Sequence, residues 1–349
     1  MADVLPGAGG RASCIGGIYE VCVGVPDLAD SIAYFERFGC RVSRIGEFDA
    51  AQSRALYGVD SPLRSVRLAH QDADHGLVRL MHWERPLNDG LGLAPNLRCI
   101  GSRWGVRLTA SVLNVANHAQ RAREAGAAIE IIEPILAVIG EVTGVGAPRP
   151  FVDPLVAVRE MVVIQPLYRQ VFFERFGYES PLYGQVDPHS MFRTSQHTHV
   201  GMMIRNDDHQ VLRFYDEVLG LKRWFDGERP YGQATGSRQI FGLAEGETHW
   251  MVDFDDPRSG YALAERRSGK LKVVRFSRDS ALPELMRRSR PGCLGPSQYT
   301  WRVNDVEGMW RRLQGGGATA ITEVLPDEFG VRAVSFTAPD GYSWTLVQA

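Results

Sequence analysis

The stretch 197–224, HTHVGMMIRNDDHQVLRFYDEVLGLKRW, constrains the fold of this chain more than any other. Its residues alternate in character from His199 to Ile204, which predicts a strand, and a polar break follows at 206–208. Apolar residues then recur at helical spacing as far as Gly220, a residue type that commonly ends a helix, and alternation resumes at 221–224. The stretch therefore predicts a strand–helix–strand unit.

Similar units begin near residues 18, 104 and 298, so the pattern occurs four times along the chain. The first and third units share SRALYG (53–58) with SRQIFG (237–242), and VRL (78–80) with VRF (274–276). The second and fourth share an Arg-rich helix that ends in a Gly-Ala segment. Because the first unit resembles the third and the second resembles the fourth, we interpret the chain as a duplication of a pair of modules.

We predict an α+β protein of four βαβββ modules, grouped in the order in which they follow one another. A flexible N-terminus (1–15) precedes an N-terminal domain of two modules (16–167), and a C-terminal domain of two modules occupies 197–349. Segment 168–196 is rich in Pro, Gly, Ser and aromatic residues and has no regular period. We interpret it as a packed interdomain linker.

The composition is that of an ordinary soluble globular protein. Of the 349 residues 44% are hydrophobic and 23% charged, and the formal net charge of -2 gives no basic excess for a nucleic-acid partner. No signal peptide or membrane-spanning run is present, which favours a cytoplasmic location. The five cysteines form no CxxC pair, which argues against a disulfide framework or a structural zinc site.

Several motifs carry a resemblance to a known family. They are the turns at 25–27 (VPD) and 304–306 (NDV), the FYDEVLGL run, the AREAGA helix end and the PDG segment before the last strand. With four ordered copies of the unit, they make the chain similar to the vicinal oxygen chelate superfamily of glyoxalases, bleomycin-resistance-type proteins, extradiol dioxygenases and epimerases. The resemblance implies that each pair of modules curls a mixed sheet around a cleft, with one potential site per pair.

The family's ligand positions imply a set of candidate site residues. The family holds a divalent metal (Zn, Fe, Mn or Ni) through residues in the first and last strands of its modules. The first-strand position lies seven residues before the helix start, and the positions selected are Glu20, Arg107, His199 and Gln298 in the first strands and Arg79, Glu160, Arg275 and Thr345 in the last strands. The metal candidates among them are His199, Gln298, Glu160 and Glu20.

In the predicted N-terminal cleft, two carboxylates and two guanidiniums can neutralise one another, so an ion-pair network competes with a metal. Glu160 beside Arg159 is also open to a purely structural ion pair. The predicted C-terminal cleft contains no carboxylate and holds a cation, Arg275, at a ligand position. We predict that His199 there acts as a general base and that Arg275 stabilises an enolate or phenolate oxygen, with Gln298 as the third catalytic candidate.

Further contacts to the substrate are predicted for Arg238, His249, Thr345 and Trp301, and for Glu20, Arg79 and Arg107 in the first cleft. Packing in the core is the alternative for Trp301, and a structural role is the alternative for His249.

The leading hypothesis is an enzyme of the vicinal oxygen chelate type. It would act on a small carbonyl or phenolic substrate by lyase or isomerase chemistry through an enolate-like intermediate in the C-terminal cleft. One alternative is a non-catalytic sequestration protein of the bleomycin-resistance type. Another is a metal-dependent extradiol-type dioxygenase, which would need His at position 298 and Glu at 345, where Gln and Thr stand. A homodimer that exchanges modules would regroup the candidates and bring Glu160 to His199.

Overall fold

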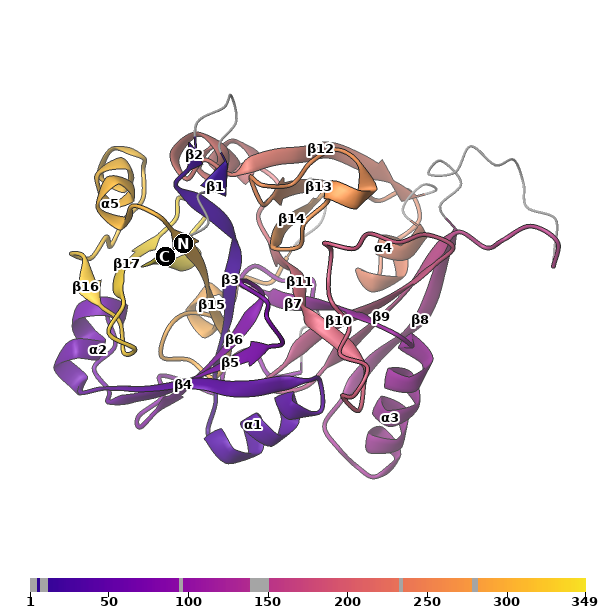
Figure 1. Cartoon of the computed structure of the whole chain (residues 1–349), viewed down its shortest axis with the longest axis horizontal. Helices are drawn as coiled ribbons and strands as arrows, with labels where there is room; N and C mark the ends of the chain where they lie inside the picture. Colours follow the sequence, from indigo (N-terminus) through magenta and orange to yellow (C-terminus); the bar gives the residue numbers. More distant parts are fainter. Residues whose placement is uncertain (1–4, 7–11, 94–96, 139–150, 232–234, 278–281) are drawn as a thin grey trace.

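The computed structural model describes residues 5–6, 12–93, 97–138, 151–231, 235–277 and 282–349. Over these residues the chain is an α+β protein of four βαβββ modules in two curled, mixed sheets (Figure 1). The predicted fold class is therefore confirmed. Each module contributes a first strand, a helical segment and three further strands.

The modules share this order and differ in their helices. Module 1 comprises β3 (Ile15–Gly24), α1 (Leu28–Glu36), β4 (Cys40–Phe48), α2 (Ala50–Tyr57), β5 (Leu63–His70) and β6 (Leu77–Trp83). Module 2 comprises β7 (Arg103–Thr109), α3 (Val112–Glu124), β8 (Glu130–Val138), β9 (Ala157–Ile164) and β10 (Arg169–Phe176). Module 3 comprises β11 (Thr194–Met203), the short helical turns η2 (Asp208–Leu212) and η3 (Phe214–Val218), β12 (Lys222–Pro230), α4 (Thr235–Ile240), β13 (Thr248–Asp255) and β14 (Lys270–Phe276). Module 4 comprises β15 (Gly295–Val303), α5 (Val306–Gly315), β16 (Leu325–Pro326), β17 (Arg332–Thr337) and β18 (Ser343–Gln348).

The helices that follow the first strands of modules 1, 2 and 4 each begin at a capping side chain. Asp27, Ser111 and Asp305 each accept a hydrogen bond from the backbone N–H three residues further on. Such a bond satisfies a donor that the first helical turn would otherwise leave unpaired. The predicted turns at 25–27 and 304–306 are thus the starts of α1 and α5.

The modules do not pair in sequence order. One eight-stranded sheet has the order β16-β17-β18-β15-β3-β6-β5-β4 and joins module 1 to module 4. The other has the order β12-β13-β14-β11-β7-β10-β9-β8 and joins module 2 to module 3. The predicted grouping of modules 1 with 2 and 3 with 4 is therefore wrong. Internal similarity records which units were duplicated, whereas the pairing of first strands depends on contacts between residues far apart in the sequence.

The predicted linker is also wrong at its N-terminal end. Within 168–196 the chain forms β10, which pairs in parallel with β7 and is the last strand of module 2. Most of the predicted flexible N-terminus lies outside the described residues. Leu5–Pro6 (β1) and Ala12–Ser13 (β2) pair with each other, and β3 already begins at Ile15.

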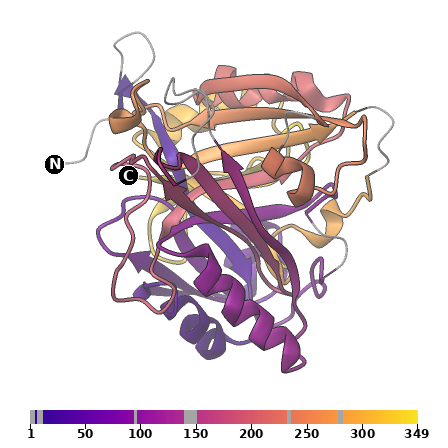
Figure 2. The ribbon, with the colours of Figure 1, turned by 90° about the vertical axis from the view of Figure 1, so that its right-hand side faces the viewer.

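A continuous apolar core lies between the outer faces of the two sheets. It contains Val21 and Val23 of β3 together with Val200 and Met202 of β11. The helix α3 packs on the same outer side, against β8, β9 and β10, as Figure 2 shows. The two sheets therefore lie back to back, and their inner faces point away from each other.

Trp301 belongs to this core. It is fully buried and its ring stacks on Trp344 with a centroid distance of 4.0 Å. The prediction that Trp301 covers a substrate is therefore wrong, and the core alternative holds. Parity explains the placement, because alternate residues of β15 face opposite sides of the sheet and Trp301 follows Thr300 of the inner face.

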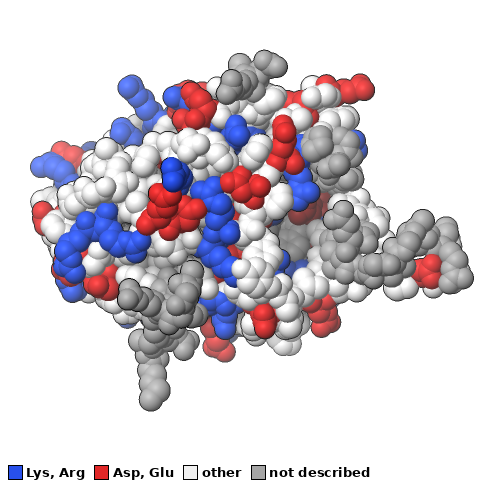
Figure 3. All heavy atoms as spheres, turned by 90° about the horizontal axis from the view of Figure 1, so that it is seen from above, with Lys and Arg blue, Asp and Glu red and all other residues white. Residues whose placement is uncertain are grey.

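Basic and acidic side chains adjoin each other near the middle of the face seen from above (Figure 3). Within the described residues, no helix has the length and apolar character needed to cross a membrane.

Candidate functional site

Each curled sheet has an inner face, and the candidate residues divide between the two. We name the inner face of modules 1 and 4 the Glu20 cleft, and that of modules 2 and 3 the His199 cleft. Glu20, Arg79, Gln298 and Thr345 all belong to the Glu20 cleft and are all buried. His199 and Glu160 belong to the His199 cleft. The predicted trio of His199, Arg275 and Gln298 is therefore not a single site.

Glu20 is the centre of an ion-pair network. Its Oε1 accepts a hydrogen bond from Arg67 Nε at 2.5 Å, and its Oε2 accepts one from a terminal guanidinium nitrogen of Arg79 at 2.6 Å. The Thr300 hydroxyl donates to Oε2 at 2.8 Å. Burial alone would raise the pKa of Glu20, but the charges of Arg79 and Arg67 lower it to about 2.

A second layer of acids compensates the two arginines. Arg79 lies 3.3 Å from Asp327 and 3.2 Å from Glu328, and Tyr57 donates its hydroxyl proton to Glu328 at 2.7 Å. Both oxygens of Glu20 are thus engaged and its charge is balanced. A cation placed against Glu20 would have to displace two guanidiniums. The ion-pair interpretation of this cleft fits the contacts, and a metal held by Glu20 does not.

Gln298, Thr345 and Ser335 form a chain of hydrogen-bonded amide and hydroxyl groups beside this network. The Thr345 hydroxyl lies 3.3 Å from Gln298 Oε1 and 2.7 Å from the Ser335 hydroxyl. A small cavity of about 140 Å³ borders Gln298 and Ser335. Neutral amide and hydroxyl groups can bind a small polar molecule there, but they supply no charge to hold a divalent metal.

His199 occupies the opposite cleft, on β11 directly across from Val106 of β7. Its Nδ1 lies 3.0 Å from the Thr198 hydroxyl and 3.1 Å from the Tyr183 hydroxyl. The Thr198 hydroxyl donates its only proton to the carbonyl oxygen of Val106. It therefore faces Nδ1 as an acceptor, whereas the Tyr183 hydroxyl can either accept a proton from Nδ1 or donate one to it.

In the tautomer that carries its proton on Nδ1, the lone pair of His199 is on Nε2. Within the described part of the chain, no group forms a hydrogen bond with Nε2. Burial, followed by the charges of Lys272, Lys270 and Arg175, holds the pKa of His199 well below its ordinary value of 6.5. A neutral imidazole with a free nitrogen and cations around it has the state required of a general base.

Glu160 lies on the same inner face, on β9 opposite Phe173 of β10, and Phe173 in turn contacts the His199 ring at 5.9 Å. Among the described residues no Lys, Arg or His forms an ion pair with Glu160; Arg159 lies near Glu174 instead. The structural ion pair considered for Glu160 is therefore absent from the structure described here.

Burial raises the pKa of the Glu160 carboxyl, and Lys272 partly opposes that rise. Helix α4 begins beside this group, because a Cβ atom at Gly236 would lie 3.1 Å from Glu160 Oε2. The structure thus joins Glu160 and His199 in one cleft within a single chain, the combination that the sequence had allowed only through exchanged modules.

Arg275 and Arg107 point away from the His199 cleft. Arg275 bonds to the carbonyl oxygen of Asn206 at 2.6 Å and lies over the ring of Trp250. Arg107 bonds to the Ser195 carbonyl oxygen at 2.8 Å from the outer face. The predicted cleft positions of both arginines are therefore wrong.

The register explains the error at Arg275. Arg79 pairs with Cys22 on β3, and the corresponding partner of Gly201 on β11 is Lys272. Lys272 is therefore the residue of module 3 that corresponds to Arg79. The similarity of VRL and VRF aligned Arg79 with Arg275, which lies three residues after Lys272. A shift by an odd number of residues moves a side chain to the other face of a strand.

Two further predicted contacts lie at the apolar end of the His199 cleft. Arg238 of α4 is placed over the ring of Tyr231. His249 is fully buried against Phe241, and burial lowers its pKa to about 4. Neither residue contacts His199 in the described structure, and the structural alternative for His249 agrees with its packing.

Sequence reasoning missed residues in both clefts. In the His199 cleft they are Lys272, Tyr183 and Thr198, and in the Glu20 cleft they are Arg67, Tyr57, Asp327 and Glu328. The alternation KLKVVRF of β14 carries a signal for Lys272, because Lys270 and Lys272 share one face and Arg275 the other. Tyr183 lies in the segment interpreted as a linker.

The metal implied by the resemblance does not fit either cleft. In the described residues no group of three or more His, Cys, Asp or Glu side chains is arranged to hold a metal ion. The His199 cleft supplies one imidazole and one carboxylate, and Lys272 stands at the matching strand position where a third ligand would be expected. An ammonium group there repels a divalent cation.

Two back-to-back sheets of paired βαβββ modules, each with a cleft, define the architecture of the vicinal oxygen chelate proteins. Residues 196–346 match the family model described as Glyoxalase/Bleomycin resistance protein/Dioxygenase superfamily. This part of the chain belongs to that superfamily, and the resemblance identified from the sequence is confirmed. A comparison with curated proteins gives no match.

Solved structures share the fold over nearly the whole chain. Glyoxalase I from Zea mays superposes with a TM-score of 0.52 at 16% identity and covers 95% of this chain and 92% of its own. A protein from Bacillus subtilis subsp. subtilis str. 168, described as a "putative dioxygenase", gives a TM-score of 0.53 at 11% identity, with coverages of 97% and 86%. At these identities the similarity concerns the fold alone.

Proposed function

We propose that the His199 cleft catalyses proton transfer on a small oxygenated substrate, in lyase or isomerase chemistry through an enolate-like intermediate. The observation that carries the proposal is that no described group forms a hydrogen bond with Nε2 of His199, while the carboxyl of Glu160, with which no described basic side chain forms an ion pair, lies on the same face. The cytoplasmic location and a possible homodimer remain predictions.

The reaction follows from the roles that these groups can fill. His199 Nε2 accepts a proton from the carbon next to a carbonyl group, and the electron pair of the broken C–H bond moves onto the carbonyl oxygen. The ammonium of Lys272 stabilises the resulting negative charge. Glu160, whose carboxyl is held toward its protonated form by burial, gives a proton to the former carbonyl carbon, and the hydroxyl proton of the first carbon passes to the former carbonyl oxygen, so that the carbonyl and hydroxyl groups exchange places. Proton exchange with water then removes the proton from His199 and returns one to Glu160.

A deuterium-exchange experiment tests this proposal without knowledge of the natural substrate. Hydroxyacetone is incubated in D2O with the protein, and the loss of its C–H signals is followed by proton NMR. We expect exchange faster than in buffer, and a loss of roughly 10²-fold or more in His199→Ala. His118→Ala removes an exposed histidine and serves as the matched control. Exchange at the wild-type rate in His199→Ala would refute the role of His199.

Sequestration is the second candidate, and the aromatic wall formed by Phe173, Tyr178 and Tyr183 favours it. Such a wall binds a flat molecule by stacking and needs no proton transfer. A ligand that binds tightly and is recovered without exchange or conversion would support sequestration over catalysis.

A further inference from the structure

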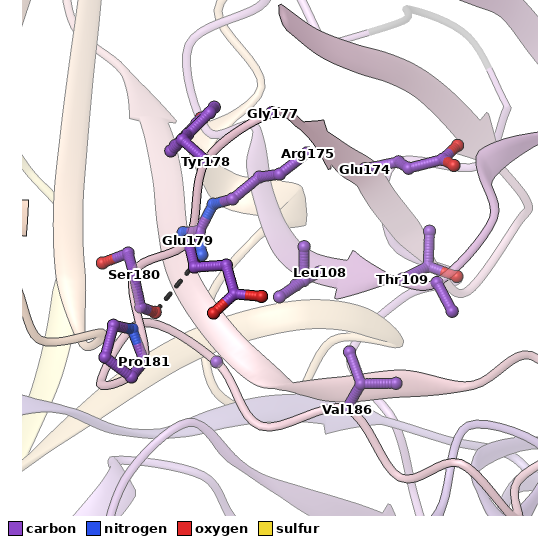
Figure 4. A pocket seen from close by; sticks show the side chains of 12 residues that line it. Leu108, Thr109, Glu174, Arg175, Gly177, Tyr178, Glu179, Ser180, Pro181 and Val186 are labelled. Carbon is purple, nitrogen blue, oxygen red and sulfur yellow. Dashed lines mark hydrogen bonds between the residues drawn. The ribbon is translucent and has the colours of Figure 1, made fainter. Parts of the chain in front are cut away.

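A large pocket opens at one end of the His199 cleft. It has a volume of about 640 Å³ and lies between the ends of β7 and β10 and the segment that follows β10. Its lining includes Leu108, Arg175, Tyr178 and Gly184 (Figure 4). None of these residues donates or accepts a proton in the reaction proposed above.

The pocket continues the inner face that carries His199. Val106 pairs with His199, and Leu108 lies two residues further along β7 on the same face, roughly 7 Å away. Tyr183 connects the two places, because its hydroxyl lies 3.1 Å from His199 Nδ1 and its ring lies 5.1 Å from the Arg175 guanidinium. Tyr183 is therefore the side chain that separates His199 from the pocket, and a ligand that displaces its ring would lie beside His199.

Arg175 is held in this pocket by aromatic rings and not by acids. Its guanidinium carbon lies 5.3 Å from the Phe173 ring, 5.7 Å from that of Tyr178 and 5.1 Å from that of Tyr183. Among the described residues no carboxylate forms an ion pair with it, and its one hydrogen bond to the backbone is a long 3.4 Å contact with the carbonyl oxygen of Ser180. Figure 4 marks this contact with a dashed line.

The neighbouring acids do not neutralise Arg175. Glu174 also lines the pocket, but it accepts a hydrogen bond from the Val112 N–H and lies 3.7 Å from Arg159, which compensates its charge. Glu179 is exposed at the rim. A half-buried guanidinium with unused donors is a site for an anion, and its planar fork matches the two oxygens of a carboxylate.

We infer that this pocket binds the carboxylate of a flat, aryl-type carboxylic acid, with Arg175 on the carboxylate and the rings of Tyr178 and Tyr183 beside the aromatic group. The inference rests on the proposed function, because it makes such an acid the substrate class on which His199 acts. Arg175 sets specificity and neither donates nor accepts the transferred proton.

The first test measures binding alone, by isothermal titration calorimetry of the full chain. Benzoate is compared with benzamide, which has the same shape without the charge, with acetate, which lacks the ring, and with phenyl phosphate. We expect benzoate to bind at least about tenfold more tightly than benzamide and acetate, and also more tightly than phenyl phosphate. Equal affinity for benzamide or acetate, or a preference for phenyl phosphate, would overturn the inference.

Variants assign the effect to Arg175. In Arg175→Gln the preference for benzoate over benzamide should disappear, and Arg175→Lys should recover only part of it, because an ammonium lacks the fork. Arg159→Gln removes an arginine of the adjacent strand that lies near Glu174, and it should keep the preference. Benzoate binding that is unchanged in Arg175→Gln contradicts the assignment. Circular dichroism of each variant checks that it is folded.

His199→Ala separates this inference from the proposed function. The variant should bind benzoate as the wild type does, since Arg175 is untouched. If hydroxyacetone exchange fails in the wild type while benzoate binding still depends on Arg175, the proton-transfer proposal falls and the acid-binding pocket stands. If exchange depends on His199 and benzoate does not bind, the pocket assignment falls alone.

Discussion

Replacing Glu20 by Gln tests whether the Glu20 cleft is held together by charge. The substitution keeps the size of the side chain and removes the negative charge that lies between Arg67 and Arg79. The fold lowers the pKa of this carboxyl from 4.5 to about 2. Since one pKa unit corresponds to about 1.4 kcal/mol, the folded state prefers the carboxylate over a neutral group by about 3 kcal/mol.

We therefore expect Glu20→Gln to lower the free energy of unfolding by about 3 kcal/mol at pH 7, measured from urea unfolding followed by circular dichroism. The matched control is Asp60→Asn, which breaks an ion pair on the surface. In that pair the side chain of Arg54 is 61% exposed and that of Asp60 is 64% exposed. That change should alter stability by less than about 0.5 kcal/mol.

The same network predicts a pH dependence with a definite sign. The carboxyl of Glu20 has a lower pKa in the folded state, so its contribution is complete above pH 4.5 and is lost as the pH falls toward about 2. Glu20→Gln should lack this component of the acid transition. A loss below about 1 kcal/mol at pH 7, in a variant whose circular dichroism matches the wild type, would refute the charge-network argument.

Three further predictions concern other parts of the molecule. Burial lowers the pKa of His70 and His249 to about 4, so the unfolded chain binds more protons below pH 6.5; stability should fall between pH 6.5 and 4 by about 3 kcal/mol for each histidine, and His249→Gln should make urea midpoints less sensitive to pH over that range. Ser268 lies 2.5 Å from His75 Nε2 in an arrangement that resembles a nucleophile and its base, but Ser268 is fully buried; a fluorophosphonate probe should therefore leave it unlabelled, and labelling would show that a path to it opens. A methyl group at Gly201 would lie 2.0 Å from the Trp104 ring, so Gly201→Ala should destabilise the fold by roughly 2 kcal/mol in urea unfolding, whereas Gly315→Ala, where a Cβ meets nothing within 4 Å, should be neutral or stabilising.

Local patterns of the sequence determined the modules and several of the site residues. Alternation and helical spacing are properties of a short window, so the first strands, the capped helices at Asp27 and Asp305 and the fourfold repetition could be predicted. The same alternation places Glu20 and His199 on inner faces, and both residues lie there. The order of the duplicated units gave the correct fold class.

The tertiary structure decided which modules share a sheet, and with that the composition of each cleft. Pairing of module 2 with module 3 brings Glu160 to His199, and pairing of module 1 with module 4 brings Gln298 to Glu20. The strand register placed Lys272, and not Arg275, on the inner face. These choices depend on packing between residues far apart in the sequence, whereas alternation within one strand fixes only which residues share a face.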